Sequence, residues 1–278
     1  MKETIYTIPV SEAYEQDCEC PLCYLQNKLE NEYAEYTLGA SLMEPDSRKL
    51  TNAKGFCKEH FELIYNKGIN KLGLALIIDT HMMTHNKKIA NITGLTSDYV
   101  DTNKPLTDED EVTKTMSLAK GVAALFRKDK SKTKNSDEAS GGTRASSIDR
   151  IIDYIDEYEH ECFICDKLNY TMNRYIDVIY YLYFSEKDFK ARFNSGNGYC
   201  LPHLRDMLLY AKKLSGDKRE EVVNVMLNMQ VTNMDRVQKD IDWFTKKFDY
   251  RYESEPWGNS RDAIPRSIKK LMGPCKFK

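Results

Sequence analysis

The sequence contains CPLC at residues 20–23 and GFCKEH at 55–60, and the same pattern returns as CFIC at 162–165 and GYCLPH at 198–203. The inner cysteines of the two stretches are separated by 33 residues in the first copy and by 34 in the second. A C-x2-C stretch, a long spacer and a G-aromatic-C-x2-H stretch therefore form an internal repeat. Such a repeat predicts two related halves of the chain.

The three cysteines and one histidine of each copy are a common ligand set for a closed, tetrahedral zinc site. Each short turn can direct two donor atoms at one ion, and the long spacer leaves room for one or two helices. We therefore expect two structural zinc ions per chain that hold helices together. Since four protein donors would surround each ion, no position would remain for a catalytic water molecule. The expected ligands are Cys20, Cys23, Cys57 and His60 in the first copy and Cys162, Cys165, Cys200 and His203 in the second.

Three other interpretations of the cysteines stay open. A C-x2-C pair can be a thiol–disulfide motif, although that motif usually lies in a strand-to-helix context and gives no reason for the histidine. Disulfide bonds would need an oxidising compartment, and the first ten residues lack the apolar segment of an export signal. An iron–sulfur cluster would more usually have four cysteines.

Three further residues lie near the motifs or carry a thiol. Cys18 could compete with Cys20 as a ligand, and the second copy has His160 at the equivalent position. The alignment of the copies favours Cys20 and Cys162, so we expect Cys18 and His160 beside the ions rather than bound to them. Cys275 lies outside both copies and is expected to be a free thiol.

The composition is that of an ordinary soluble protein, with 41% hydrophobic and 30% charged residues in 278. The net charge of −2 gives no general attraction to nucleic acid or to an anionic membrane. No apolar run reaches the 18 or more residues that a membrane span needs. We therefore expect a cytoplasmic protein without a membrane segment.

Apolar residues recur at three- and four-residue spacing through most of the chain, and no segment alternates with the period of two that is typical of strands. This predicts an all-α fold, a helical bundle of two pseudo-repeated halves, each stapled by one metal site. The first half is expected at 1–126, a polar flexible linker at 127–147 and the second half at 148–278.

Two local expectations can be checked separately. The longest periodic stretch, 217–251, predicts one long amphipathic helix, and a further helix is expected over 109–126. Residues 1–17 predict an irregular lead-in, because Pro9 interrupts them.

A strongly apolar helix expected over 74–92 carries His81 and His85, an i, i+4 pair on one helical face. Metalloproteases use that spacing with a glutamate directly after the first histidine, but here Met82 follows. We expect two ordinary helix histidines rather than a second kind of metal site.

The two pairs of motifs, with a C-terminal stretch from Trp257 to the LMG at 271–273, resemble an uncharacterised family of cytoplasmic proteins from anaerobic Gram-positive bacteria. The resemblance covers most of the chain except the linker at 127–147. It implies one site of three cysteines and one histidine in each copy. It implies no particular biochemical activity.

No glycine-rich phosphate loop and no G-x-S-x-G motif occurs in the sequence. We therefore expect a non-enzymatic zinc protein that binds a protein or small-molecule partner, although an enzyme site between the halves stays open. Eighteen tyrosines indicate aromatic packing, with an aromatic ligand pocket as the alternative. A thiol-based redox or metal sensor and a nucleic-acid-binding regulator are the competing functions, and the second of these lacks a basic face.

Overall fold

The computed structural model of the chain describes residues 5–94 and 147–275. All regular structure in these two ranges is helical, and no strand occurs in them, which confirms the all-α prediction. Among the described residues, no helix is long and apolar enough to cross a membrane. The helix expected over 109–126 and nearly all of the expected linker at 127–147 lie outside the described residues.

The chain divides into two compact units, which do not follow the order of the two sequence copies. Unit 1 combines Met1–Tyr33 with Asp166–Lys278, and unit 2 comprises Ala34–Cys165. The expected halves, 1–126 and 148–278, therefore each contribute residues to both units.

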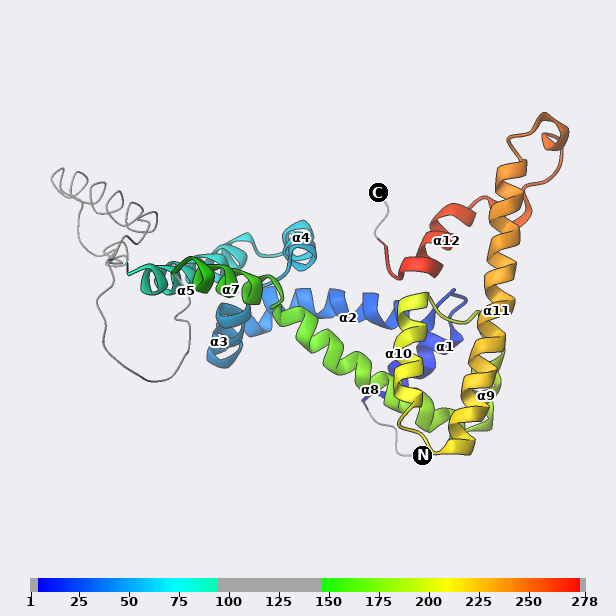
Figure 1. Ribbon diagram of the computed structural model, residues 1–278, viewed down its shortest axis with the longest axis horizontal. Helices are drawn as coiled ribbons and strands as arrows, with labels where there is room; N and C mark the ends of the chain where they lie inside the picture. Colours follow the sequence, from blue (N-terminus) through cyan, green and yellow to red (C-terminus); the bar gives the residue numbers. More distant parts are fainter. Residues whose placement is uncertain (1–4, 95–146, 276–278) are drawn as a thin grey trace, which may run out of the picture. The chain divides into compact units, whose positions relative to one another are not determined.

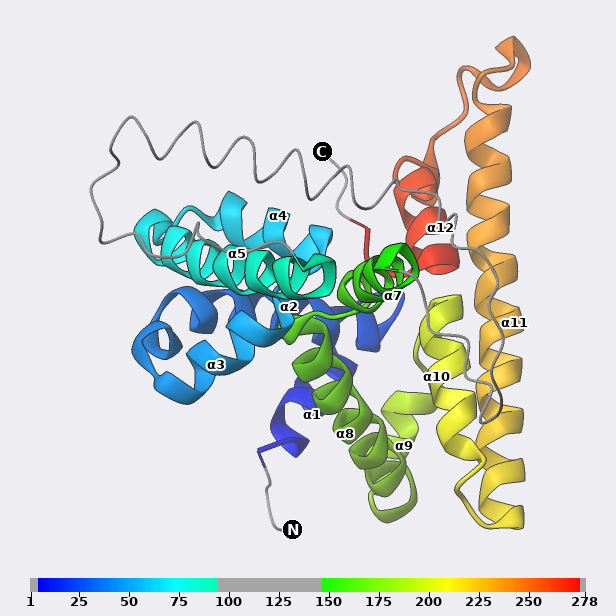
Figure 2. The same cartoon turned by 60° about the vertical axis from the view of Figure 1, so that its left-hand side comes forward.

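Unit 1 is built around one apolar core, and its helices are shown in Figures 1 and 2. The longest helix, α11, covers most of the periodic stretch expected at 217–251, and both α10 and α12 pack against it. The helices that lie wholly or mainly in this unit are α1 (Thr7–Glu15), α2 (Pro21–Leu38), α8 (Phe163–Ser185), α9 (Lys187–Asn194), α10 (Leu201–Ala211), α11 (Gly216–Lys246) and α12 (Ala263–Met272). Two short 3-10 helices, Tyr250–Tyr252 and Gly258–Ser260, connect the last two helices.

The expectation of an irregular lead-in is wrong, because α1 is a helix. Pro9 is its third residue, and a proline is tolerated in a first turn since the backbone N–H there has no partner within the helix. Val10 and Ala13 are fully buried in the core of unit 1, so tertiary packing stabilises a helix that we did not predict from the sequence.

The core of unit 1 also contains a pair of buried tyrosines. The hydroxyl groups of Tyr14 and Tyr199 are 2.6 Å apart, so each polar tip finds a partner inside the apolar core. Burial raises the pKa of both phenols well above the ordinary value. Because Tyr199 directly precedes Cys200, this contact fixes one of the motif turns to the core.

Unit 2 consists of shorter helices around α5, with clear start and stop signals. Asn70 caps α5, because its side chain accepts a hydrogen bond from the backbone N–H of Gly73 at 2.8 Å. Both α3 and α7 pack against α5. The elements of this unit are a 3-10 helix (Ala40–Met43), α3 (Pro45–Lys54), α4 (Lys58–Lys67), α5 (Lys71–Thr93) and α7 (Ser147–Glu159), with the end of α2 and the start of α8.

Candidate metal centres

The eight expected ligands form two groups of four, but each group takes two residues from each sequence copy. We name the groups the Cys20 site and the Cys57 site. The donor atoms of each group all lie within 4.8 Å of one another. The Cys20 site comprises Cys20, Cys23, Cys200 and His203, and the Cys57 site comprises Cys57, His60, Cys162 and Cys165.

The expectation that each copy builds its own site is therefore wrong. The C-x2-C stretch of the first copy meets the C-x2-H stretch of the second, and the reverse holds for the other site. The Cys20 site lies within unit 1 and the Cys57 site lies within unit 2. Each unit therefore holds one complete group of four donors, with two from each copy.

Each site is assembled from the N-terminal turns of two helices. Cys20 directly precedes α2 and Cys23 lies in its first turn, while Cys200 is the N-cap of α10 and His203 lies in its first turn. The Cys57 site repeats this arrangement with α8 and α4. The positive end of each helix dipole points toward the sulfur atoms and favours their ionised form.

The backbone also supports the sulfur atoms. In the C-x2-C turns, the N–H of Cys23 donates to Sγ of Cys20 at 3.4 Å, and the N–H of Cys165 donates to Sγ of Cys162 at 3.5 Å. Two residues before each C-x2-H pair a glycine has positive φ, 57° at Gly55 and 81° at Gly198. Glycine adopts this conformation without steric cost, and the turn then presents the next cysteine to the site.

The distances between donor atoms match a tetrahedral zinc ion. With Zn–S near 2.3 Å and Zn–N near 2.0–2.1 Å, a tetrahedron has S···S edges of about 3.8 Å and S···N edges of about 3.6 Å. In the Cys20 site, Cys200 Sγ is 3.9 Å from Cys20 Sγ and 3.5 Å from Cys23 Sγ. Nδ1 of His203 lies 3.1–3.5 Å from the three sulfur atoms.

The Cys57 site has the same spacing. Sγ of Cys57 and Sγ of Cys165 are 3.8 Å apart, and Nδ1 of His60 lies 3.2–3.4 Å from the three sulfur atoms. The six motif cysteines, together with Cys18 and Cys275, form no disulfide bond in the described residues. The residues in both groups therefore fit a structural zinc ion, and the histidine would bind through Nδ1.

Crowding of three sulfur atoms perturbs their ionisation in each site. Hydrogen bonds from neighbouring thiols lower the pKa of Cys200 to about 4 and that of Cys162 to about 3. Hydrogen bonds with Cys20 and then Cys200 raise the pKa of Cys23, and the hydrogen bond with Cys162 raises that of Cys165. One thiolate per site is thus stabilised by its neighbours, whereas three thiolates together need a cation between them.

The turns of the Cys20 site are held by side chains from α11 and α12. The amide of Gln230 accepts from the backbone N–H of Tyr199 at 3.0 Å and donates to its carbonyl oxygen at 2.9 Å. Nζ of Lys270, a residue that is only 1% exposed, donates to the backbone oxygens of Glu19 and Asn197. Lys270 therefore ties together the two turns that precede Cys20 and Cys200.

A network of ion pairs surrounds the carboxylate of Glu19. Arg236 donates to both of its oxygens at 2.7 and 2.8 Å, and Nζ of Lys270 lies 3.3 Å from one of them. Arg266 pairs with Asp240 at 2.8 Å on the same side. Partly buried, multidentate pairs of this kind hold their geometry better than isolated surface pairs. The structural role of Lys270 was not predicted from the sequence, because nothing in the sequence around this lysine indicates that it is buried.

The Cys57 site is supported mainly by the backbone. The N–H of Phe163 donates to the carbonyl oxygen of Gly55 at 3.0 Å, which joins the two ligand turns. The imidazole of His81 lies against Gly55, so close that a Cβ atom there would be 2.3 Å from Nε2. Nδ1 of His81 donates to the carbonyl oxygen of Asn52 at 2.7 Å.

The two helix histidines form a hydrogen-bonded chain rather than a site of their own in the described part of the molecule. Nε2 of His81 and Nε2 of His85 are 2.9 Å apart, and Nδ1 of His85 meets the hydroxyl of Tyr154. One set of tautomers satisfies every link: Tyr154 donates to His85, His85 donates to His81, and His81 donates to Asn52. Burial lowers the pKa of His85 to about 4, and the charges of His81 and Lys88 add to this effect.

The remaining sulfur and histidine residues stand outside the two groups. The carbonyl oxygen of Cys18 accepts from the side chain of Asn197 at 3.2 Å, so Cys18 belongs to the turn before the Cys20 site. Nδ1 of His160, on the surface, bonds to the carbonyl oxygen of Asp156 at 2.7 Å. Neither residue is among the four donors of its neighbouring site.

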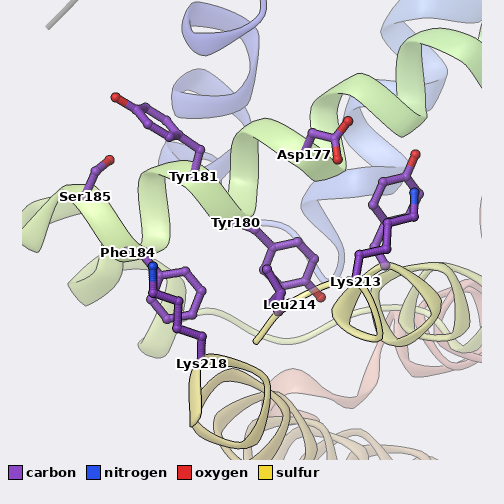
Figure 3. A pocket seen from close by; sticks show the side chains of 9 residues that line it. Asp177, Tyr180, Tyr181, Phe184, Ser185, Lys213, Leu214 and Lys218 are labelled. Carbon is purple, nitrogen blue, oxygen red and sulfur yellow. The ribbon is translucent and has the colours of Figure 1, made fainter. Parts of the chain in front are cut away.

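Unit 1 also has an aromatic pocket of about 350 Å³, shown in Figure 3. Its apolar lining includes Tyr180 and Phe184, and two lysines stand at its edge. Nζ of Lys213 lies 3.6 Å from the ring centre of Tyr210, and Nζ of Lys218 lies 5.1 Å from that of Phe184. Flat apolar surface next to ammonium groups suits a small anion with an aromatic body.

Comparisons with known proteins give the family but no activity. No curated protein and no solved structure matches the chain. A family model described as a family of unknown function, DUF6062, matches residues 1–278. The chain, with its two clusters of three cysteines and one histidine, therefore belongs to the DUF6062 family.

Proposed function

We propose that this protein is a non-enzymatic, cytoplasmic, zinc-stapled helical protein that binds a partner. The observation that supports the zinc assignment is the set of donor distances, which fits a tetrahedral ion in both groups. Four protein donors complete such a coordination shell, so each ion has a structural role. We also propose that the family occurs in anaerobic Gram-positive bacteria.

Zinc would stabilise the fold strongly because the ligands come from distant parts of the chain. Cys23 and Cys200 are 177 residues apart in sequence, and Cys57 and Cys165 are 108 residues apart. Structural zinc sites of small domains contribute roughly 10–16 kcal/mol of apparent binding free energy, which is as large as the total stability of a typical domain, about 5–15 kcal/mol. Folding of this chain is therefore expected to depend on metal.

Metal analysis of the untagged, full-length protein tests this part of the proposal. We expect two zinc ions per chain, and we expect loss of helical circular dichroism when a strong chelator removes them. Cys200→Ser should lower the content to one ion per chain, whereas Cys275→Ser, which changes a thiol outside both groups, should keep two. Helicity that survives complete removal of zinc would contradict the structural role.

The proposed partner is a protein or a small molecule, and the pocket of Figure 3 is the candidate small-molecule site. We expect benzoate-like aromatic carboxylates to raise the unfolding temperature more than cyclohexanecarboxylate of the same charge. The double change Lys213→Ala and Lys218→Ala should abolish that difference. Equal shifts from both ligands would argue against this pocket and leave a protein partner. With a net charge of −2, nucleic acid is not the expected partner.

A further inference from the structure

We propose that the Cys57 site is an oxidation-sensitive thiol site, at which a hydroperoxide joins Cys57 and Cys165 in a disulfide and releases the metal, while the Cys20 site stays intact. This inference rests on the proposed binding of zinc to both groups. Three differences between the two sites, which have the same types of ligand, support the inference. They are the exposure of the sulfur atoms, the charges beside them and the hydrogen bonds that hold their turns.

The first difference is access to the sulfur atoms. At the Cys57 site, two of three cysteines, Cys57 and Cys165, are partly exposed, and their Sγ atoms are 3.8 Å apart. At the Cys20 site only Cys23 is partly exposed, whereas Cys20 is 4% exposed and Cys200 is fully buried. An oxidant that reaches the Cys57 site thus meets two accessible, neighbouring sulfurs.

The second difference is the charge beside each site. Zinc with three thiolates and one neutral imidazole carries one net negative charge, which makes the sulfur atoms nucleophilic. At the Cys20 site Arg236 pairs with both oxygens of the neighbouring Glu19 carboxylate, and the buried ammonium of Lys270 acts on both Cys20 and Cys200, so the surroundings offset this charge. At the Cys57 site the carboxylate of Glu59, two residues from Cys57, lies beside its sulfur atom and has the opposite sign, so it does not offset the negative charge.

The third difference is the freedom of the turns. To form a disulfide, two sulfur atoms must approach from more than 3 Å to about 2.05 Å, so their backbones must shift. At the Cys20 site the two-point bond from Gln230 to Tyr199 and the link through Lys270 resist that shift. At the Cys57 site the two turns are joined through the backbone, by the hydrogen bond from the N–H of Phe163 to the carbonyl oxygen of Gly55.

The chemistry balances with one hydroperoxide per disulfide. The thiolate of one cysteine attacks the peroxide, so that an S–O bond forms, the O–O bond breaks and the departing oxygen takes a proton. The second thiolate attacks that sulfur, the S–S bond forms, the S–O bond breaks, and hydroxide leaves and takes a second proton. Two thiolates lose two electrons, and the hydroperoxide becomes an alcohol and water. Only Cys162 and His60 would then remain to hold a zinc ion, and two donors would bind it far more weakly than four.

Limited oxidation of the zinc-loaded full-length protein tests the inference. Hydrogen peroxide is added while a chromogenic indicator reports free zinc, and the disulfides are mapped by mass spectrometry of peptides. We expect one zinc ion per chain to be released about ten times faster than the second, which corresponds to a barrier difference of about 1.4 kcal/mol. We expect the linked peptides to contain Cys57 and Cys165.

A charge variant gives an independent readout. Lys270→Met keeps the length of the side chain but removes the ammonium, so release of the second ion should become faster. Lys269→Met, an exposed neighbour on α12, is the matched control and should behave like the natural protein. Release of both ions at one rate, first disulfides at the Cys20 site, or no release at all would overturn the inference. Purified protein without zinc would instead overturn the proposed function.

Discussion

Gly55→Ala tests whether the glycine turn, and not only the metal ligands, determines the stability of the Cys57 site. Gly55 has φ 57° and ψ −149°, a region of backbone conformation that is essentially reserved for glycine. Its missing side chain also makes room for a buried histidine, because a Cβ atom there would lie 2.3 Å from Nε2 of His81.

The expected cost has two parts. Forcing alanine into this conformation costs about 1–3 kcal/mol. His81 would also have to move, which would break its 2.7 Å hydrogen bond to Asn52 and cost about a further 1–2 kcal/mol. The sum, about 2–5 kcal/mol, is large enough to weaken zinc binding at the adjacent turn.

Gly68→Ala is the matched control. Gly68 also has positive φ, 63°, but it lies in the left-handed helical region at the end of α4, and a Cβ atom there would meet nothing within 4 Å. This change should cost only about 1–2 kcal/mol. Adding His81→Ala to Gly55→Ala should recover the steric part of the loss but not the backbone part.

Urea unfolding of the zinc-loaded protein and competition with a zinc chelator measure both effects. We expect Gly55→Ala to lower the unfolding midpoint and to release zinc from one site at a lower chelator concentration. The reasoning is refuted if Gly55→Ala and Gly68→Ala have equal effects, or if His81→Ala gives no recovery in the double variant.

Two further predictions concern the side chains beside the sites. Gln230→Ala should lower the free energy of unfolding by about 2–4 kcal/mol, since the buried backbone N–H and carbonyl of Tyr199 lose their partner. Gln238→Ala, on the exposed side of α11, is the control and should change it by less than about 0.5 kcal/mol. Urea titration compares the two variants, and equal losses would contradict the role of Gln230. Because the folded state lowers the pKa of His85 from 6.5 to about 4, the unfolded chain binds more protons in that window, so His85 should contribute stability that is complete above pH 6.5 and is lost as the pH falls toward 4. Thermal unfolding should show that the unfolding temperature falls less steeply between pH 6.5 and pH 4 in His85→Gln than in His160→Gln. Identical pH profiles would contradict the role of His85.

The identity of the eight candidate ligands could be read from the sequence, but their grouping could not. Spacing alone predicts that Cys20 and Cys23 belong to one site and that Cys57 and His60 belong to one site. Between these pairs runs α2, whose 18 residues extend about 27 Å and carry the chain away from its first turn. The spacer therefore separates the two pairs of one copy, and a pair from the other copy completes each site.

The helical class was predictable because apolar spacing near 3.6 residues is a local signal. The helix α1 was not, since its two fully buried residues, Val10 and Ala13, depend on a core that later parts of the chain provide. Lys270 was equally hidden. Its neighbours in sequence predict a polar face of α12, and the buried ammonium group is explained by the carbonyl groups of Glu19 and Asn197 and by the carboxylate of Glu19, which are distant in sequence.

The crossed grouping of ligands has a consequence for the order of assembly during translation. In a nascent chain that has emerged only as far as residue 126, four donors are present, yet they belong to two different candidate sites and complete neither. The Cys57 site can form once Cys165 has left the ribosome, whereas the Cys20 site must wait for His203. Any metal would therefore complete its coordination first at the Cys57 site, and Cys20 and Cys23, which are synthesised first, would wait for the last donor, His203.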